Sequence, residues 1–169
     1  MRTLYVRELV CSYRPKLDPS GQRIPSPRRL HQPDDTAAFL RTLLEHEPVE
    51  VVVVVFLSGR YDVLCVHEVS RGGISFTCLD RRDIVKAGLL VNCSALIVAH
   101  SHPSGDPTPS PEDRDLTSWI YGACRFVNIS LLDHVIIGAD GAYCSFKQSG
   151  LLRGCVEAVE AVFSGTGRS

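Results

Sequence analysis

The strongest constraint on the fold is an unbroken apolar segment, Val51–Leu57, which consists of five valines, a phenylalanine and a leucine. Branching at Cβ favours extended backbone, and a strand without polar residues must be covered on both of its faces. Ala95–His100 has the same character apart from its final histidine. Both segments are far shorter than the roughly 20 apolar residues that cross a bilayer. The sequence therefore predicts buried central strands, no transmembrane span and no membrane partner.

Helical and extended patterns alternate around these two segments. A first helix is expected with Asp34 or Asp35 as its N-cap and with its end near Glu47, just before Pro48. A second helix is expected after Asp80, a favourable N-cap residue. Further strands are predicted at residues 61–69, 74–79, 131–137 and 142–146, and further helices at 111–126 and 152–163. This alternation is typical of the α/β class, and 169 residues suffice for one domain.

The first 33 residues differ in charge and composition from the rest of the chain. Met1–Pro33 holds seven basic and two acidic residues, a net charge of +5, which leaves −6 for the remainder because the whole chain carries −1. Five prolines between residues 15 and 33 favour an irregular arm. We therefore divide the chain into a basic, proline-rich arm, 1–33, and a domain, 34–169. The favoured interpretation docks the arm on its own acidic domain, and nucleic acid is the alternative partner.

The cysteines and the N-terminus bear on the compartment. The seven cysteines are spread singly, without a C-x-x-C pair, and most lie among apolar residues of predicted elements. Free cysteine in such places is a small core residue, so we assign none a chemical role. Arg2 and Arg7 are not followed by an apolar segment with a cleavage site, so no signal peptide is predicted. A cytoplasmic chain is the expectation.

The residues that suggest chemistry lie between residues 99 and 113. His100 and His102 stand two positions apart at the end of a predicted strand, so their side chains leave the same face and can converge on one ion. Asp113 follows at the start of the next predicted helix, after a loop whose three prolines and Gly105 can turn the chain back toward the strand. Two histidines and one carboxylate leave a fourth position for water, as in catalytic zinc sites.

A helix start is the alternative explanation of part of this motif. The run Ser110-Pro111-Glu112-Asp113 also has the pattern of a serine N-cap followed by proline at the first helical position. Capping alone would account for Ser110 and Asp113. Residue types and spacing therefore leave both the metal and the capping interpretation open.

The stretch from His100 to Asp113 resembles the metal-binding motif of the JAB/MPN-type metalloproteases, in which H-x-H is followed by a serine and an aspartate and preceded by a distant glutamate. The RadC-like branch is the one that the chain resembles most specifically. The similarity lies in the motif His-x-His-Pro-Ser-Gly-Asp-Pro-Thr-Pro-Ser-x-x-Asp, in Leu132-Asp133-His134 and in residues 68–72. The resemblance covers roughly residues 34–152. It implies one JAB/MPN-like (cytidine-deaminase-like) α/β domain, with a mixed central sheet flanked by helices.

The resemblance also implies roles for individual residues. His100, His102 and Asp113 would hold one divalent metal ion, zinc, and Glu50, which matches the family's distant glutamate, would act as the general base that activates a metal-bound water. Ser110 would donate a hydrogen bond to the oxyanion. The implied activity is hydrolysis of peptide or isopeptide bonds in a protein or peptide substrate, with a ubiquitin-like tail as one option.

Two other classes of function compete with a metalloprotease. One is a RadC-like module that associates with nucleic acid in DNA repair or on mobile elements and whose metal site has no catalytic role. The other is a scaffold whose closed pocket admits no substrate. Binding to nucleic acid would weaken steeply with salt, whereas hydrolysis would depend on the metal and on chelators.

Three points depart from the family or stay open. RadC-like proteins usually have asparagine where this chain has Ser101, whose side chain should face away from the metal. They also carry an N-terminal helix-hairpin-helix region, for which the arm 1–33 is too short and too rich in proline. Asp133 and His134 point to opposite faces of their predicted strand, so at most one can face the metal. A structural role is the favoured interpretation of His134, with a contact to a metal ligand as the alternative.

Overall fold

The computed structural model describes residues 13–17, 20–23, 26, 27, 29, 30, 32–72 and 79–165. Its centre is a five-stranded mixed sheet in the order β2-β1-β3-β4-β5. Strands β3 and β4 run parallel, and the other neighbouring pairs run antiparallel. The strands are β1 (Val51–Leu57), β2 (Val63–Arg71), β3 (Ala95–Ser101), β4 (Ser130–Ile137) and β5 (Tyr143–Ser145). The expected mixed sheet of an α/β domain is confirmed.

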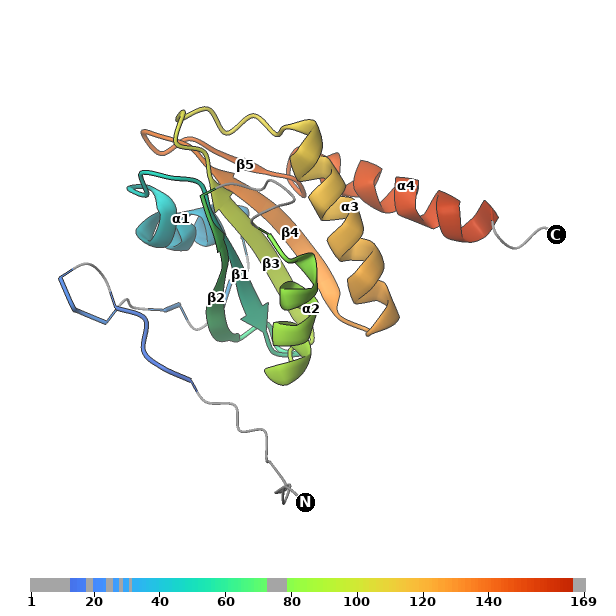
Figure 1. The fold of residues 1–169 in the computed structure, drawn as a ribbon, viewed down its shortest axis with the longest axis horizontal. Coiled ribbons are helices and arrows are strands. Elements are labelled where there is room, and N and C mark those ends of the chain that lie inside the picture. The colour runs from blue at the N-terminus through green and yellow to red at the C-terminus, as the bar shows by residue number, and fades with distance from the viewer. Residues whose placement is uncertain are drawn as a thin grey trace, which may run out of the picture.

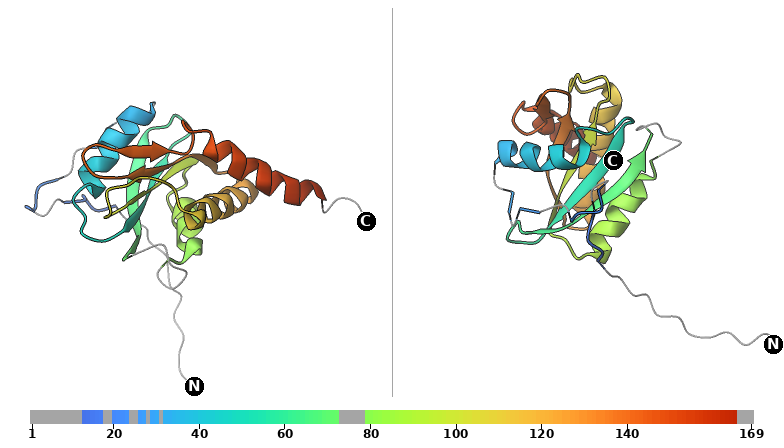
Figure 2. Two further views of the ribbon diagram at one scale, coloured as in Figure 1. Left: turned by 90° about the horizontal axis from the view of Figure 1, so that it is seen from above. Right: turned by 90° about the vertical axis from the view of Figure 1, so that its left-hand side faces the viewer.

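Helices cover both faces of this sheet. Figures 1 and 2 show α1 on one face and α2 and α3 on the other, while α4 runs beside α3 and extends past the edge of the sheet. The helices are α1 (Pro33–Leu44), α2 (Arg81–Leu90), α3 (Pro111–Phe126) and α4 (Leu151–Gly165). The sheet is therefore the middle layer of three.

Strand β1 explains why the chain forms two hydrophobic cores. Side chains alternate between the faces of a strand, so its odd-numbered residues pack with α1 and its even-numbered residues pack with α2 and α3. All seven residues of β1 are buried. Burying one such valine or leucine stabilises the fold by about 1.5–3 kcal/mol, which makes the apolar segment a strong determinant of the three layers.

The first helix differs from the prediction at both ends. It begins at Pro33 with Gln32 as N-cap, and Asp34 and Asp35 lie in its first turn, where their carboxylates interact favourably with the helix dipole. Proline suits the first helical position because its missing N–H would have no partner there. The helix ends at Leu44 rather than near Glu47. Pro48 disfavours helical backbone in the residue before it, and the last turn is lost with it.

Most other predicted elements are confirmed, with small shifts at their ends. Strands β1 and β2 form an antiparallel hairpin, and Asp80 caps α2 by accepting a hydrogen bond from the Arg82 amide at 3.1 Å. The strand predicted at residues 74–79 falls almost wholly outside the described residues, and Leu79 itself is not in a strand. Of the five cysteines described as free, Cys93, Cys124 and Cys155 are buried and the other two are partly buried, as expected of core residues.

The described part of the arm touches the domain at two ion pairs. Arg29 Nε lies 2.9 Å from Asp62 Oδ1, and Lys16 Nζ lies 3.7 Å from Glu68 Oε2. Both acidic partners belong to the hairpin of β1 and β2. Among the described residues, no helix combines the length and the apolar character needed to cross a membrane.

Candidate metal centre

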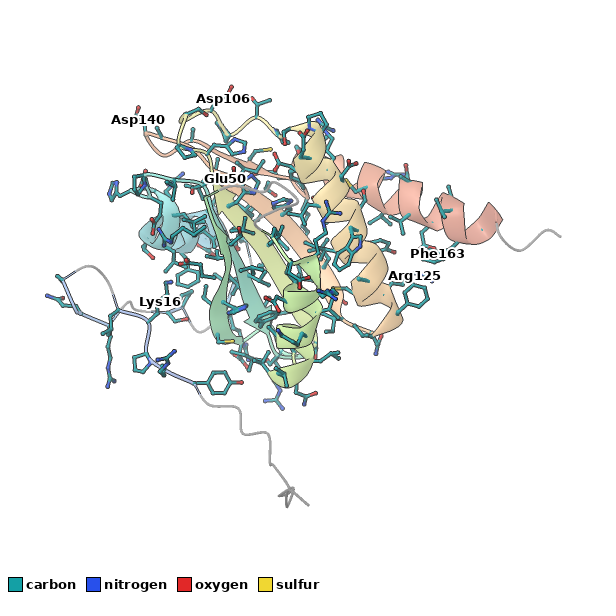
Figure 3. All side chains as sticks on the ribbon, viewed as in Figure 1. Lys16, Glu50, Asp106, Arg125, Asp140 and Phe163 are labelled. Carbon is teal, nitrogen blue, oxygen red and sulfur yellow. The ribbon has the colours of Figure 1, made fainter. Side chains whose placement is uncertain are left out.

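The candidate metal centre lies where three elements meet at one end of the sheet. His100 is near the carboxyl end of β3 and His102 follows that strand, while Asp113 is in the first turn of α3. Glu50 immediately precedes β1, whose antiparallel pairing with β3 brings its start to the same end of the sheet. In Figure 3 the labelled Glu50 and Asp106 lie at this end, and Arg125 and Phe163 lie far from it.

The distances between the ligand atoms fit a small divalent ion. His100 Nε2 lies 2.9 Å from His102 Nε2 and 3.1 Å from Asp113 Oδ1, and His102 Nε2 lies 3.7 Å from Asp113 Oδ2. Metal–ligand bonds of about 2.0–2.1 Å in a tetrahedral zinc site place neighbouring ligand atoms about 3.3 Å apart. The three side chains therefore present donors of the right kind at the right spacing.

Glu50 stands slightly outside this set of three. Its Oε1 lies 4.0 Å from His100 Nε2, and its side chain keeps 25% of its exposure, whereas His100 and Asp113 are almost fully buried. Together with His102, these side chains form a cluster of four potential metal ligands whose ligand atoms lie within 4.8 Å of one another. The structure thus brings together the three predicted ligands and the predicted base, with Glu50 at the exposed rim.

The loop between the histidines and Asp113 is held by the turn between β4 and β5. The Ala139 amide donates to the Gly105 carbonyl at 3.0 Å, and the His102 amide donates to the Ile137 carbonyl at 2.9 Å. A Cβ atom on Gly138 would lie only 2.3 Å from the Gly105 oxygen, so this position requires glycine. The loop also offers the Asp106 carbonyl to His102 Nδ1 at 2.7 Å.

Asp113 serves as a helix cap and faces the site at once. Its Oδ2 accepts a hydrogen bond from the Ser110 amide at 2.8 Å, and the Ser110 hydroxyl accepts one from the Asp113 amide at 3.1 Å, which completes a capping box. Its Oδ1 is the atom that lies beside His100. Burial raises the pKa of Asp113, but the hydrogen bonds with His100 and His102 outweigh it and hold the pKa well below its usual range. The two interpretations of the sequence are therefore compatible.

A chain of buried hydrogen bonds supports His100 from behind. His100 Nδ1 lies 2.9 Å from His134 Nε2, and His134 Nδ1 lies 2.7 Å from the Thr117 hydroxyl. That hydroxyl donates to the Asp113 carbonyl at 2.6 Å, so it can only accept from His134. His134 then carries its proton on Nδ1 and accepts from His100 Nδ1. The chain leaves the Nε2 lone pair of His100 free to face the site.

His134 therefore has a closer connection to the site than its favoured structural interpretation implied. The ring is completely buried and stacks on Phe146 at 4.8 Å, and burial lowers the pKa of His134 well below its ordinary value, which keeps the ring neutral. Asp133 points the other way and accepts from the Ser145 hydroxyl at 2.6 Å. Sequence reasoning missed Thr117, although its position four residues after Asp113 puts both on one face of α3.

These observations define the class of the protein. It is a three-layer α/β domain with a candidate divalent-metal centre at the carboxyl end of a central strand. The sequence matches the family model described as the RadC-like JAB domain over residues 30–151. That match covers well over half of the chain, so the chain belongs to the family of RadC-like JAB domains.

Two curated relatives share this part of the sequence. A UPF0758 protein of Symbiobacterium thermophilum is 39% identical over 116 residues, which is 69% of this chain and 49% of the relative. A UPF0758 protein of Neisseria meningitidis serogroup B is 41% identical over 123 residues, which is 73% of this chain and 54% of the relative. The chain thus spans about half the length of these relatives, and neither name states an activity.

Proposed function

We propose that this chain is a zinc-dependent hydrolase of peptide or isopeptide bonds. The observation that carries the proposal is the spacing of 2.9, 3.1 and 3.7 Å among the ligand atoms of His100, His102 and Asp113. Two imidazoles and one carboxylate are a donor set that zinc favours, and three protein ligands leave a position open for catalysis. When bound there, zinc would lower the pKa of a water toward about 7 and polarise the scissile carbonyl.

Glu50 is the residue proposed as general base. Its carboxylate lies 4.0 Å from His100 Nε2 and remains partly exposed, so a water and a substrate can reach it from the rim. From this place it can take a proton from the attacking water and return it to the leaving nitrogen. The roles divide by burial, because the almost fully buried Asp113 serves as a ligand and the partly exposed Glu50 serves in proton transfer.

Ser110 is the residue proposed to stabilise the oxyanion. Its oxygen accepts the Asp113 amide hydrogen, which leaves the hydroxyl hydrogen available for donation. A hydroxyl that is held in place before the reaction stabilises the developing charge without the cost of reorganisation. Capping the helix and donating to the oxyanion are thus compatible roles of one side chain.

The substrate is proposed as a protein or peptide, with a ubiquitin-like tail as one option. Selection of the substrate depends on surfaces beside the metal centre. This chain spans only about half the length of its curated relatives, so the substrate of the whole protein is part of the proposal. The cytoplasm is the proposed compartment, because a reducing environment keeps cysteines such as those described here in the thiol form.

The proposal is tested by cleavage of a proteome-derived peptide library, read out by mass spectrometry. Zinc-loaded protein should cleave peptides, and a chelator should stop the cleavage. Glu50→Gln should lower the rate by about 100-fold to 10,000-fold while zinc content stays at one equivalent, because proton transfer is lost and the ligands remain. Glu112→Gln makes the same chemical change on an exposed residue of α3 and should leave the rate unchanged.

Two outcomes would contradict this proposal. Zinc-loaded protein that cleaves none of the library peptides would argue against hydrolysis. A Glu50→Gln variant that is as active as the parent would remove Glu50 from the mechanism.

A nucleic-acid-associated module is the second candidate, and the described part of the arm favours it. Tyr13, Arg14 and Arg23 are exposed and line a hollow beside β2. Exposed cations next to an aromatic ring are typical of surfaces that bind single-stranded nucleic acid. Fluorescence anisotropy with a labelled DNA strand should then show binding that weakens steeply with salt and is lost when Arg14 and Arg23 are both changed to alanine. Binding that ignores salt would exclude this candidate.

A further inference from the structure

Ser101 lies between the two histidines but faces away from them. Its side chain is buried, with 3% of the residue exposed. Its hydroxyl oxygen accepts a hydrogen bond from the Val51 amide at 3.1 Å and donates to the Val49 carbonyl at 3.4 Å. Those two groups belong to the peptide units on either side of Glu50. One hydroxyl therefore connects the strand that carries His100 with the backbone on both sides of Glu50.

This contact lies just beyond the last residue pair of β1 and β3. The register of β1 and β3 ends at the pair Val52 and His100, whereas β3 continues along β4 through Ser101 and Ile137. Beyond the last pair, the Val51 amide meets the side chain of Ser101. The paired register of β1 and β3 therefore ends at His100, one of the candidate metal ligands.

The other side of Glu50 is also fixed. Its carbonyl accepts a hydrogen bond from the Gly72 amide at 2.7 Å, at the end of the neighbouring strand β2. Ser101 and Gly72 thus hold the Glu50 backbone from two sides, while the carboxylate itself stays at the rim. A side chain with a fixed backbone and a free carboxylate suits a proton carrier that must not become a permanent ligand.

We propose that Ser101 is a positioning residue that sets the distance between the Glu50 carboxylate and the metal centre. This inference depends on the proposed role of Glu50 in hydrolysis. The hydroxyl is suited to it because it both accepts and donates, so it holds the two peptide units with one atom. A displacement of about 1 Å at a reacting group can slow a reaction about 100-fold, which makes a backbone clamp at this place significant.

Three variants separate this role from a general contribution to stability. Ser101→Ala removes both hydrogen bonds. Ser101→Asn keeps an acceptor and a donor in one side chain and serves as the rescue. Ser94→Ala removes the hydroxyl of an exposed serine that immediately precedes β3, at the other end of the strand, and serves as the control.

The first measurement is hydrogen exchange of the Val51 amide by NMR on zinc-loaded protein. In Ser101→Ala this amide should exchange about tenfold faster or more because its acceptor is gone, and in Ser101→Asn and Ser94→Ala it should stay protected. Zinc content should remain at one equivalent in all three variants, since Ser101 is no ligand. This measurement needs no turnover.

The second measurement is cleavage of a peptide selected from the library. Ser101→Ala should lower kcat by about tenfold to 100-fold with KM and zinc content unchanged, and Ser101→Asn should restore kcat to within about threefold of the parent. A parent without turnover would contradict the proposed function, and the exchange measurement would then judge the clamp alone. Unchanged protection of Val51 in Ser101→Ala, or an unchanged kcat in an active parent, would overturn the role of Ser101.

Discussion

The two halves of the candidate metal centre come from the chain in different ways. His100, His102 and Asp113 belong to one short segment, which consists of a strand end, a loop and a helix start. Glu50 and His134 reach the same place from two other strands, through the pairing of β3 with β1 and with β4. His100, His102 and Asp113 are thus the local half of the centre, because one segment carries them, whereas Glu50 and His134 are the tertiary half, because strand pairing brings them to the site.

The largest effect on zinc binding should come from removing a ligand of the local half. His100→Ala removes the ligand that lies nearest to both other ligand atoms, so zinc content should fall from about one equivalent to none. Elemental analysis of protein purified without added metal measures this directly. His67→Ala, on β2, is the control and should keep the full equivalent. A His100→Ala protein that retains zinc would place the ion elsewhere and would break the comparison.

The next effect should come from the tertiary half. His134→Phe removes the acceptor that fixes the His100 ring, and we expect zinc affinity to fall by about tenfold to 100-fold, as for other residues that support metal ligands. His134→Gln places an amide oxygen in the same region and should recover part of the affinity. Competition with a fluorescent zinc indicator measures both variants. Equal affinities of His134→Phe and the parent would reduce His134 to a residue of the core.

The sequence predicted the local half well for physical reasons. Alternation along a strand places His100 and His102 on one side, and a serine before proline predicts the helix start that positions Asp113. The distance of Glu50 from the ligands depends on register between strands, and the contact of His134 with His100 depends on β3 and β4 being adjacent. Periodicity in one segment carries no information on either, so only the resemblance indicated Glu50, and Thr117 was missed.

The contact between the ligand loop and the turn that follows β4 offers a third test. It joins the two halves of the centre, because the loop carries His102 and β4 carries His134. Gly138→Ala places a methyl group against the Gly105 carbonyl and should destabilise the protein by about 1–3 kcal/mol, as overpacking does elsewhere. It should also weaken zinc binding, since Gly105 lies in the loop that carries His102. Gly154→Ala, on α4 with open space around it, should instead leave stability equal or raise it. Thermal unfolding with and without zinc measures the stability of both variants. A Gly138→Ala protein as stable as the parent would show that the turn does not support the site.

The smallest effect should come from the far end of the hydrogen-bond chain. Thr117→Val keeps the shape of the side chain but removes the hydroxyl that accepts from His134 Nδ1, so the ring loses the partner that sets its tautomer. Because Thr117 lies one hydrogen bond further from the metal centre than His134, we expect zinc affinity to fall by only about threefold to tenfold. Thr36→Val is the matched control, since this buried threonine of α1 also donates to the carbonyl four residues before it, at 3.0 Å, away from the site. Both variants lose one buried hydroxyl and should lose similar stability, so a difference in zinc affinity between them isolates the tautomer from packing. If Thr117→Val and Thr36→Val bind zinc equally tightly, Thr117 does not contribute to the support of His100, and His134 is the last residue that does.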